Sequence, residues 1–372
     1  MNLFWNSKTR NTVLRLFQHL PIRKGRVMCV CWGGNSFGCN PAAIAKELLR
    51  HSEFEVCFAF NDLSRYKASV SSQILAVQIG SFDYFKLLAT SQFVISNTRL
   101  AGGLFWPFPK RKGQFYIQTM HGGHGIKKVE WDVADKLPSD YLEVAEKDRM
   151  ATDLMLSDSD YWTRVYRDAF KYEGEVLEKG LPRNDVFFSS NSIAQDPKYL
   201  IYAPTFRDNG RQDVYGFNFD AVISALETRF GGKWFIRISS HPNMLSYYKA
   251  LYDFSHPRLI DVGDQDLQTL LLSSHAMITD YSSTEMDFSL TGRPVFQLCK
   301  DRAEFNRGFY INPEDLPFPY AETDDQLVQN ILDFDEQKYK ISLDTFNRHV
   351  IGLHETGSAS EAVTDWMLSK VK

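Results

Sequence analysis

The sequence alternates short apolar runs with helical stretches, and this alternation restricts the chain to a small set of folds. The apolar run 27–32 is followed by Gly33-Gly34, a helical stretch over 41–49 and a second apolar run over 54–60. Short apolar runs bounded by turn residues predict buried strands, and strands that alternate with helices predict a parallel sheet. The first half adds expected strands at 93–96 and 114–119 and a helix over 83–90.

The second half of the chain repeats the same alternation. Residues 199–204 predict a strand that ends in a turn, and the helical stretch 219–230 is followed by Gly231-Gly232. Glycine commonly ends helices, so this pair marks a helix terminus. The later segments predict strands at 233–239, 258–262, 276–279 and 294–298 and helices at 267–274 and 284–291.

The length of 372 residues exceeds what one ordinary hydrophobic core supports, so two domains are expected. The polar stretch 189–197 is the best linker. We therefore predict an α/β protein with two doubly wound, Rossmann-like parallel sheets that face a cleft. The expected parts are an N-terminal segment at 1–25, a first domain at 26–190, a second domain at 198–350 and a C-terminal helix at 351–372.

Composition excludes several functional classes. The formal charge of −4 lacks the basic excess of a dedicated nucleic-acid binder. Five scattered cysteines without a C-x-x-C pair fit a reducing cytoplasm. No run of about 18 apolar residues predicts a membrane-spanning helix.

The N-terminal segment is basic and amphipathic. Leu14, Leu16 and Leu20 alternate there with Arg15 and Lys24, among others. Such a segment can lie on an anionic membrane surface, or it can pack on the first domain. Both interpretations stay open at this point, and the first places the protein on the inner face of the cell membrane.

A glycine-rich turn follows the strand expected at 114–119. His121 at this strand end suits a general base, and Lys127 and Lys128 suit an anionic substrate. The alternative is a structural glycine turn with a solvated histidine. A metal site made of His121 and His124 lacks a third ligand at a suitable spacing.

Two polar turns occupy the equivalent position in the second domain. His241 follows the strand expected at 233–239, and Asp280, Ser282, Ser283 and Thr284 follow the strand at 276–279. Hydroxyl residues at the start of a helix serve as caps, and they also bind phosphate together with backbone N–H groups. The sequence contains no Walker motif, which argues against an ordinary ATPase.

Two arginines lie in further turns. Arg207 comes just after the strand at 199–204, and Arg183 and Asn184 lie just before the linker. A guanidinium group suits phosphate by its charge and fork geometry. Each arginine equally suits a structural ion pair.

Together these motifs resemble the CDP-glycerol glycerophosphotransferase family, the teichoic-acid primases and polymerases. Met120 departs from the family pattern, which usually has Trp there, and His124 is an extra histidine in the glycine turn. These departures concern the acceptor more than the donor. The matching stretches are 118–128, 180–185, 202–207, 240–243, 278–283 and 357–361, in that order along nearly the whole chain.

The resemblance implies a GT-B-like fold, with an acceptor in the first domain and CDP-glycerol in the second. It implies that His121 is the catalytic base and that His241 holds the donor diphosphate with the hydroxyl turn. The implied reaction moves glycerol phosphate to a hydroxyl of a polymeric or lipid-linked acceptor, in teichoic acid or capsule synthesis, and releases CMP. A CDP-ribitol donor, a nucleotide-sugar glycosyltransferase and a catalytically silent binding protein are the alternatives. A divalent cation such as Mg²⁺ is a possible cofactor.

Overall fold

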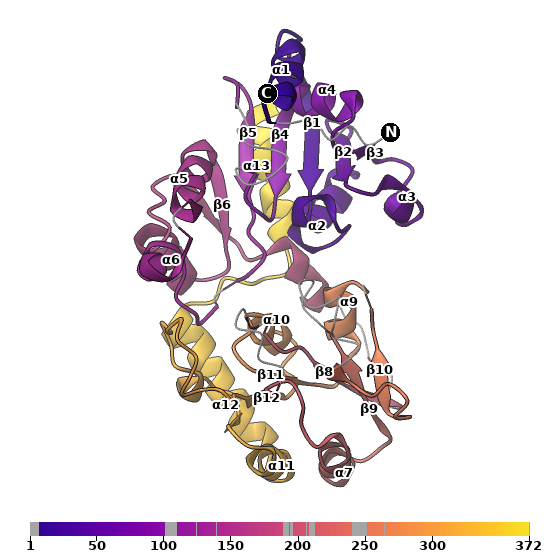
Figure 1. The fold of residues 1–372 in the computed structure, drawn as a ribbon, viewed down its shortest axis with the longest axis vertical. Helices are drawn as coiled ribbons and strands as arrows, with labels where there is room; N and C mark the ends of the chain where they lie inside the picture. Colours follow the sequence, from indigo (N-terminus) through magenta and orange to yellow (C-terminus); the bar gives the residue numbers. More distant parts are fainter. Residues whose placement is uncertain are drawn as a thin grey trace. The chain divides into compact units, whose positions relative to one another are not determined.

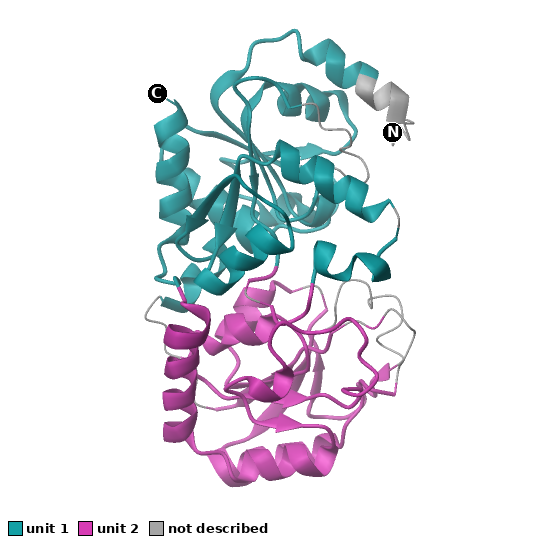
Figure 2. Cartoon of the chain, turned by 90° about the vertical axis from the view of Figure 1, so that its left-hand side faces the viewer, with its two compact units in different colours: residues 1–121, 129–188, 354–372 teal, residues 122–128, 189–353 magenta. Residues whose placement is uncertain are grey.

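The computed structural model describes residues 7–100, 110–123, 125–138, 140–188, 193, 196–205, 207, 213–239, 251–263 and 265–371. The chain forms two compact units, shown in teal and magenta in Figure 2. Unit 1 consists of residues 1–121, 129–188 and 354–372, and unit 2 consists of residues 122–128 and 189–353.

Unit 1 is built on a seven-stranded parallel sheet with the order β3-β2-β1-β4-β5-β6-β7 (Figure 1). All six residues of β4 are buried, as expected for a parallel strand covered on both faces. The strands are β1 Arg23–Val30, β2 Glu55–Phe60, β3 Leu75–Gln78, β4 Ser91–Ser96, β5 Phe115–Gln118, β6 Leu154–Ser157 and β7 Glu175–Glu178.

Helices cover both faces of this sheet, because alternate strand residues point to opposite sides. Cys29 packs in one core with α2 and α13, to which Met367 contributes, while Met28 packs in a second core with α1 and α4, to which Leu14 contributes. The helical segments of unit 1 are α1 Ser7–Phe17, η1 Trp32–Gly34, α2 Cys39–Leu48, α3 Leu63–Tyr66, η2 Lys67–Ser69, α4 Phe82–Thr90, η3 Glu130–Lys136, α5 Tyr141–Ala151, α6 Asp160–Asp168, η4 Pro182–Phe188 and α13 Ala359–Val371.

Unit 2 repeats the design with a six-stranded parallel sheet of order β10-β9-β8-β11-β12-β13. The strands are β8 Lys198–Tyr202, β9 Trp234–Ile238, β10 Leu259–Asp261, β11 Ala276–Thr279, β12 Val295–Leu298 and β13 Tyr320–Ala321. The helical segments are α7 Phe219–Phe230, α9 Leu267–Leu272, α10 Thr284–Ser289, η6 Pro313–Asp315, α11 Asp324–Leu332, α12 Glu336–Thr345 and η7 Phe346–Ile351.

In each sheet the chain order reverses at one place, between β1 and β4 in unit 1 and between β8 and β11 in unit 2. Loops that leave these neighbouring strands diverge to opposite faces, and ligands of doubly wound proteins bind at this opening. The residues that follow β1, β4, β8 and β11 are therefore the first place to look for chemistry.

The predicted α/β class with two doubly wound parallel sheets is confirmed. Each strand expected from the sequence is present, with its ends shifted by at most two residues, except that β1 begins four residues earlier than expected, at Arg23. Four strands were missed, namely β3, β6, β7 and β13. β3 and β7 are edge strands that are only partly buried, so they lack a continuous apolar run, and β13 has only two residues.

The division into units differs from the expected boundaries. The C-terminal segment 354–372 belongs to unit 1, because Val363 and Met367 of α13 are buried in a core of that unit. Residues 122–128 lie in the first half of the sequence, but they belong to unit 2. Within the described ranges, no helix is long and apolar enough to cross a membrane.

Candidate functional site

Three polar or aromatic side chains follow neighbouring strands at the switch point of unit 1. Trp32 follows β1, Asn97 follows β4 and His121 follows β5. Val30 is in register with Ser96, and Ser96 with Gln118, so the three strands end at one edge of the sheet. The topology therefore brings these three residues together.

His121 is exposed and held in a defined orientation. Its Nδ1 lies 2.9 Å from the backbone carbonyl oxygen of Asn97. A carbonyl only accepts hydrogen bonds, so Nδ1 carries the proton and Nε2 is the basic nitrogen of the neutral ring. The Trp32 ring packs against the imidazole with its centroid 4.5 Å away. A histidine fixed in this tautomer suits a general base.

Arg183 and Asn40 order the turn that carries His121. The buried Arg183 side chain donates through Nη1 to the carbonyl of His121, and its own N–H donates to Oδ1 of Asn40 at 3.1 Å. Asn40 in turn donates to the carbonyl of Met120 at 3.1 Å. The contacts described for Arg183 therefore give it a positioning role within unit 1.

Asn184 also serves the framework of unit 1. Its side chain is buried and donates to Oε1 of Glu355 at 2.8 Å, and the same oxygen accepts from the N–H of Leu181 at 3.1 Å. Glu355 precedes α13, so these bonds tie the turn after β7 to the C-terminal segment. The substrate-binding role that the sequence suggested for Arg183 and Asn184 stays a prediction beside these framework contacts.

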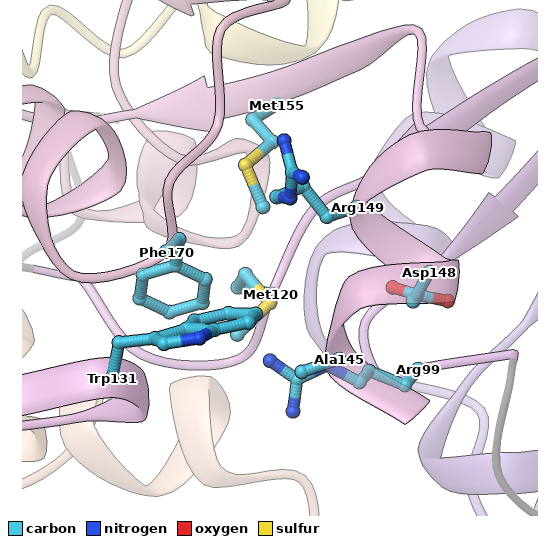
Figure 3. Close-up of a pocket in the computed structure, with 8 residues that line it drawn as sticks. All are labelled: Arg99, Met120, Trp131, Ala145, Asp148, Arg149, Met155 and Phe170. Atoms are coloured by element: carbon cyan, nitrogen blue, oxygen red, sulfur yellow. The ribbon is translucent and has the colours of Figure 1, made fainter. Parts of the chain in front are cut away.

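Met120 precedes the base and has a backbone φ of 51°, in the left-handed region. Its side chain lines a small cavity together with Trp131 and Phe170 (Figure 3). The cavity volume of about 10 Å³ suits a single water molecule. Met120 is therefore part of the packing under the turn, while the next residue, His121, is exposed.

In unit 2 the switch point lies between the turns after β8 and β11. Asp280 follows β11, and its Oδ1 accepts hydrogen bonds from the backbone N–H of Thr205 at 2.8 Å and of Tyr281 at 2.6 Å. Asp280 thereby joins the two turns. The buried hydroxyl oxygen of Thr205 has no hydrogen-bond partner in the described part of the chain.

Arg207 lies buried between two carboxylates. It binds Asp280 through Nη2 at 2.8 Å and Asp301 through Nε at 2.6 Å, and Nη1 donates to the carbonyl of Thr205 at 2.6 Å. Burial works to lower the pKa of Arg207, but the two carboxylates outweigh it and raise this pKa. The guanidinium charge is thus already balanced by two carboxylates, and the expected contact of Arg207 with a bound phosphate stays a prediction.

The hydroxyl turn after Asp280 is partly exposed. Ser282 Oγ lies 3.0 Å from Thr284 Oγ1 and accepts from the N–H of Thr284 at 3.3 Å, an ordinary local turn. Ser283 precedes α10 without a side-chain cap. Because α10 has only six residues, its dipole contributes little to anion binding. The hydroxyl groups of Ser282, Ser283 and Thr284 at its start are the better anion ligands.

The loop 122–128 packs on this hydroxyl turn. A Cβ atom on Gly122 would lie 3.3 Å from Ser283 Oγ, and one on Gly125 would lie 3.5 Å from Ser283 Cβ, so glycines permit the close approach. The end of the loop is fixed by a bridge between Lys127 and Phe309 and by the Lys128 N–H, which donates to the Gly308 carbonyl at 3.1 Å.

Lys127 is a cation of this loop that interacts electrostatically with Asp280, the residue that follows β11. It is half-buried, and among the described residues no hydrogen bond or ion pair involves its ammonium group. Burial lowers the pKa of Lys127 to about 8, and the carboxylate of Asp280 opposes this lowering. We call Thr205, Ser282, Ser283 and Lys127 the hydroxyl–lysine cluster. It offers hydroxyl groups and one cation to an anion.

Two predicted histidines lie outside the described residues, His241 and His124. Sequence reasoning passed over Trp32, Asn97 and Thr205, although each directly follows a strand at a switch point. That position was the signal that could have identified them.

One group of three potential metal ligands occurs among the described residues, namely Asp160, Glu178 and His354. Asp160 and Glu178 are exposed, and His354 Nε2 lies 2.8 Å from Asp160 Oδ1.

With this geometry described, the chain can be compared with known proteins. The model of the family described as CDP-glycerol:poly(glycerophosphate) glycerophosphotransferase matches residues 12–369. The chain is 26% identical over 388 residues to a teichoic acid poly(glycerol phosphate) polymerase of Bacillus spizizenii, covering 96% of this chain and 95% of that protein. It is 26% identical over 380 residues to a teichoic acid glycerol-phosphate transferase of Staphylococcus aureus, covering 95% of each.

Solved structures share the fold. The wall teichoic acid polymerase TagF superposes with a TM-score of 0.79 at 23% identity, covering 98% of this chain and 94% of that chain. A UDP-GlcNAc 2-epimerase from Neisseria meningitidis superposes with a TM-score of 0.54 at 13% identity, covering 92% and 100%. At these identities both likenesses concern the architecture alone, since one fold hosts many functions.

The charge balance around Arg207 predicts an order of stabilities. Arg207→Met leaves two buried carboxylates without a counter-ion and should lower the free energy of unfolding by about 3–5 kcal/mol. Asp301→Asn leaves the Arg207–Asp280 pair intact and should lower it by about 1–2 kcal/mol. Urea unfolding at neutral pH measures both losses. Arg348→Met, which breaks an exposed pair with Asp344, is the control and should cost at most about 0.5 kcal/mol. Equal losses for Arg207→Met and Asp301→Asn would contradict the assignment.

Proposed function

The chain belongs to the CDP-glycerol:poly(glycerophosphate) glycerophosphotransferase family, and on this basis we propose that it transfers glycerol phosphate from CDP-glycerol to a hydroxyl group of a surface polymer. The polymer is of the teichoic acid type, as in the names of the relatives. The observation that carries the proposal is the loop after β5. It begins next to the oriented base His121 and continues, from Gly122, into the segment that packs on Ser283.

The reaction we propose is a direct displacement at phosphorus. Nε2 of His121 takes the proton of the acceptor hydroxyl, and the oxygen attacks the phosphorus that carries glycerol. A new P–O bond forms to the acceptor, the bond to the CMP phosphate breaks, and CMP leaves with the electron pair. Such a transfer requires mainly positioning and neutralisation of charge.

The hydroxyl–lysine cluster would hold the donor's diphosphate. Lys127 supplies the positive charge, and the hydroxyl groups of Thr205, Ser282 and Ser283 supply hydrogen bonds to phosphate oxygens. Lys128, next in the chain, adds a second cation to the same loop. Arg207 and Asp280 act indirectly by holding the turns after β8 and β11 in place.

His241 and a metal ion are further parts of the proposal. His241 follows β9, the neighbour of β8, and its assignment to the donor phosphates rests on this sequence position. A Mg²⁺ ion would enter with the donor and share the diphosphate charge with Lys127.

The choice of donor is the direct test of the function. We expect CMP release with CDP-glycerol and a lipid-linked polymer primer, and no UDP release with a UDP-sugar. CDP-ribitol is the second candidate donor, because a teichoic acid ribitol-phosphate primase of Bacillus spizizenii is 24% identical over 379 residues. The released CMP or UDP is measured with CDP-glycerol, CDP-ribitol and a UDP-sugar, each in the presence of Mg²⁺ and in the presence of EDTA. UDP release from a sugar donor in place of CMP release would refute the proposal.

Substitution of the base His121 should affect kcat, whereas substitution in the hydroxyl–lysine cluster should affect the affinity for the donor. His121→Ala removes the base and should lower kcat by about 100- to 10,000-fold while CDP-glycerol still binds. Ser282→Ala with Ser283→Ala removes hydrogen bonds to the donor and should weaken its affinity about tenfold. Calorimetric binding of CDP-glycerol and CMP release measure the two effects. Unchanged turnover in His121→Ala excludes the base role, and unchanged affinity in the serine variant excludes the donor cluster.

We also propose that the N-terminal segment lies on an anionic membrane on the inner face of the cell membrane. The helix α1 packs through Val13 and Leu14 on unit 1, while Leu16 is 64% exposed and Leu20 is 38% exposed. Arg15, which precedes Leu16, is exposed and can attract anionic lipid headgroups. One face of the segment thus serves packing, and the other is available for lipid.

Vesicle binding tests this membrane association. Leu16→Ser with Leu20→Ser should weaken binding to vesicles that contain anionic phosphatidylglycerol by about tenfold or more, since each burial of a leucine contributes about 1.5–3 kcal/mol. Ile341→Ser is the matched control, because Ile341 is 61% exposed on α12 of unit 2. Sedimentation with vesicles measures the bound fraction. Equal binding of both variants would show that the segment does not contact lipid.

A further inference from the structure

Two of the sequence motifs, far apart in the chain, meet in unit 1. The stretch 180–185 includes the start of η4, and the stretch 357–361 includes the start of α13. The carboxylate of Asp185 accepts hydrogen bonds from the N–H of Ala359 at 2.9 Å and of Ser360 at 2.8 Å. The first N–H groups of a helix have no partner within it, so Asp185 caps α13 from a distant segment. The proposed reaction leaves this contact without a role.

Glu355, just before the second motif, holds both ends of the turn 181–184. Its Oε1 accepts from the N–H of Leu181 at 3.1 Å and from Nδ2 of Asn184 at 2.8 Å. The turn is closed by the N–H of Asn184, which donates to the Leu181 carbonyl at 2.8 Å. Gly180 has a φ of 91°, and a Cβ atom there would lie 2.3 Å from Oε2 of Glu355. A glycine is therefore required to seat the acid against the turn.

Arg183 lies inside this turn and connects it to His121. Its N–H donates to Oδ1 of Asn40 at 3.1 Å, and its Nη1 donates to the carbonyl of His121. Asn40 also fixes the preceding residue, because its Nδ2 donates to the Met120 carbonyl at 3.1 Å. A continuous series of hydrogen bonds thus runs from Glu355 through the turn to the backbone of His121, and all of these residues belong to unit 1.

We propose that Glu355 is a positioning residue of the reaction, which acts through Arg183 to fix the orientation of His121. The inference rests on the proposed function, since it takes His121 as the base. In the orientation that matters, Nδ1 of His121 lies 2.9 Å from the Asn97 carbonyl oxygen, which leaves Nε2 as the basic nitrogen. Glu355 binds the turn and not the imidazole, so its effect on the base is indirect.

Loss of the Glu355 carboxylate would release the turn. The N–H of Leu181 and the amide of Asn184 are buried, and buried donors without a partner are costly, so the turn would shift until both found new acceptors. Arg183 would move with the turn, and the His121 carbonyl would lose its donor. A displacement of about 1 Å in a catalytic group is enough to slow a reaction about 100-fold.

The kinetic experiment compares Glu355→Ala with Glu355→Gln in the full-length protein. Glu355→Ala should lower kcat about 10- to 100-fold and leave the affinity for CDP-glycerol within about twofold, because the hydroxyl–lysine cluster keeps all of its residues. Glu355→Gln retains an amide oxygen that can accept both hydrogen bonds, so it should restore at least about half of the wild-type kcat. CMP release measures kcat, and calorimetry measures the affinity for CDP-glycerol.

The tautomer of His121 gives a readout that does not depend on turnover. In protein labelled with nitrogen-15 at histidine, the NMR shifts of the two ring nitrogens report which one carries the proton, at about pH 9, where an imidazole is neutral. We expect the proton on Nδ1 in the wild type. Glu355→Ala should show a mixture of both tautomers, because the contact with the Asn97 carbonyl is weakened. The His121 signals are identified by their absence in His121→Ala.

Met367→Ala is the matched control for stability. Met367 is fully buried in the core that α13 completes, so its truncation destabilises the same helix without removing a hydrogen bond of Glu355. This variant should lower Tm at least as much as Glu355→Ala does. At temperatures well below the transition, its kcat and its His121 tautomer should be those of the wild type.

A double-mutant cycle tests whether Glu355 acts through Arg183. Arg183→Met by itself should lower kcat about 10- to 100-fold. Adding Glu355→Ala to it should lower kcat by less than about threefold more, because the connection to His121 is already cut. If Glu355→Ala does not fold, Glu355→Asp decides the matter, since its carboxylate is one methylene too short to reach both donors. It should change kcat and the tautomer in the same direction.

The outcomes separate this inference from the proposed function. A Glu355→Ala protein with the kcat and the His121 tautomer of the wild type overturns the inference. An equal loss of kcat in Met367→Ala overturns it as well, and so do effects of Glu355→Ala and Arg183→Met that simply multiply. Absence of CMP release in the wild type would instead remove the proposed function, and the tautomer measurement would still decide whether Glu355 orients His121.

Discussion

The structure depends on one constraint of parallel sheets, which is that all strands of a sheet end at the same edge. In each unit the chain order reverses between two central strands, and the turns that follow them diverge there. Residues far apart in the sequence, such as Asn97 and His121, therefore lie in contact without any motif that links them. The same constraint joins Thr205 to Asp280 in unit 2. The proposed base, His121, follows β5, the neighbour of β4. The hydroxyl groups proposed to hold the donor follow β8 and β11.

Charge compensation divides the polar residues of unit 2 into two groups. Arg207 is balanced by Asp280 and Asp301 in a buried network, and this network holds the turns after β8 and β11. Lys127 has no such partner among the described residues and is only half-buried. A cation whose charge is already balanced stabilises the framework, whereas one that is incompletely balanced remains available to an anionic ligand. Burial and pairing, more than residue type, thus separate the framework cation Arg207 from Lys127, the cation proposed to bind the donor.

The secondary structure could be predicted well, and the site only in part. Strands such as β4 and β11 are buried throughout and contain an apolar run, so their pattern is visible in the sequence, whereas β13 has two residues and no pattern. The position of His121 at a strand end was predictable, and so was the hydroxyl turn after β11. The framework roles of Arg183 and Asn184 were not, because their partners His121 and Glu355 are distant in the sequence.

The sequence by itself determined the α/β class, the two sheets and the family, because apolar periodicity and ordered motifs are local properties of the chain. Only the tertiary structure decided that residues 122–128 pack with unit 2, that α13 completes unit 1, and that Asn97 sets the tautomer of His121. It also decided which cation is already balanced by buried carboxylates. The physical reason is that desolvation and pairing depend on the neighbours of a group in space, and these neighbours come from distant parts of the chain.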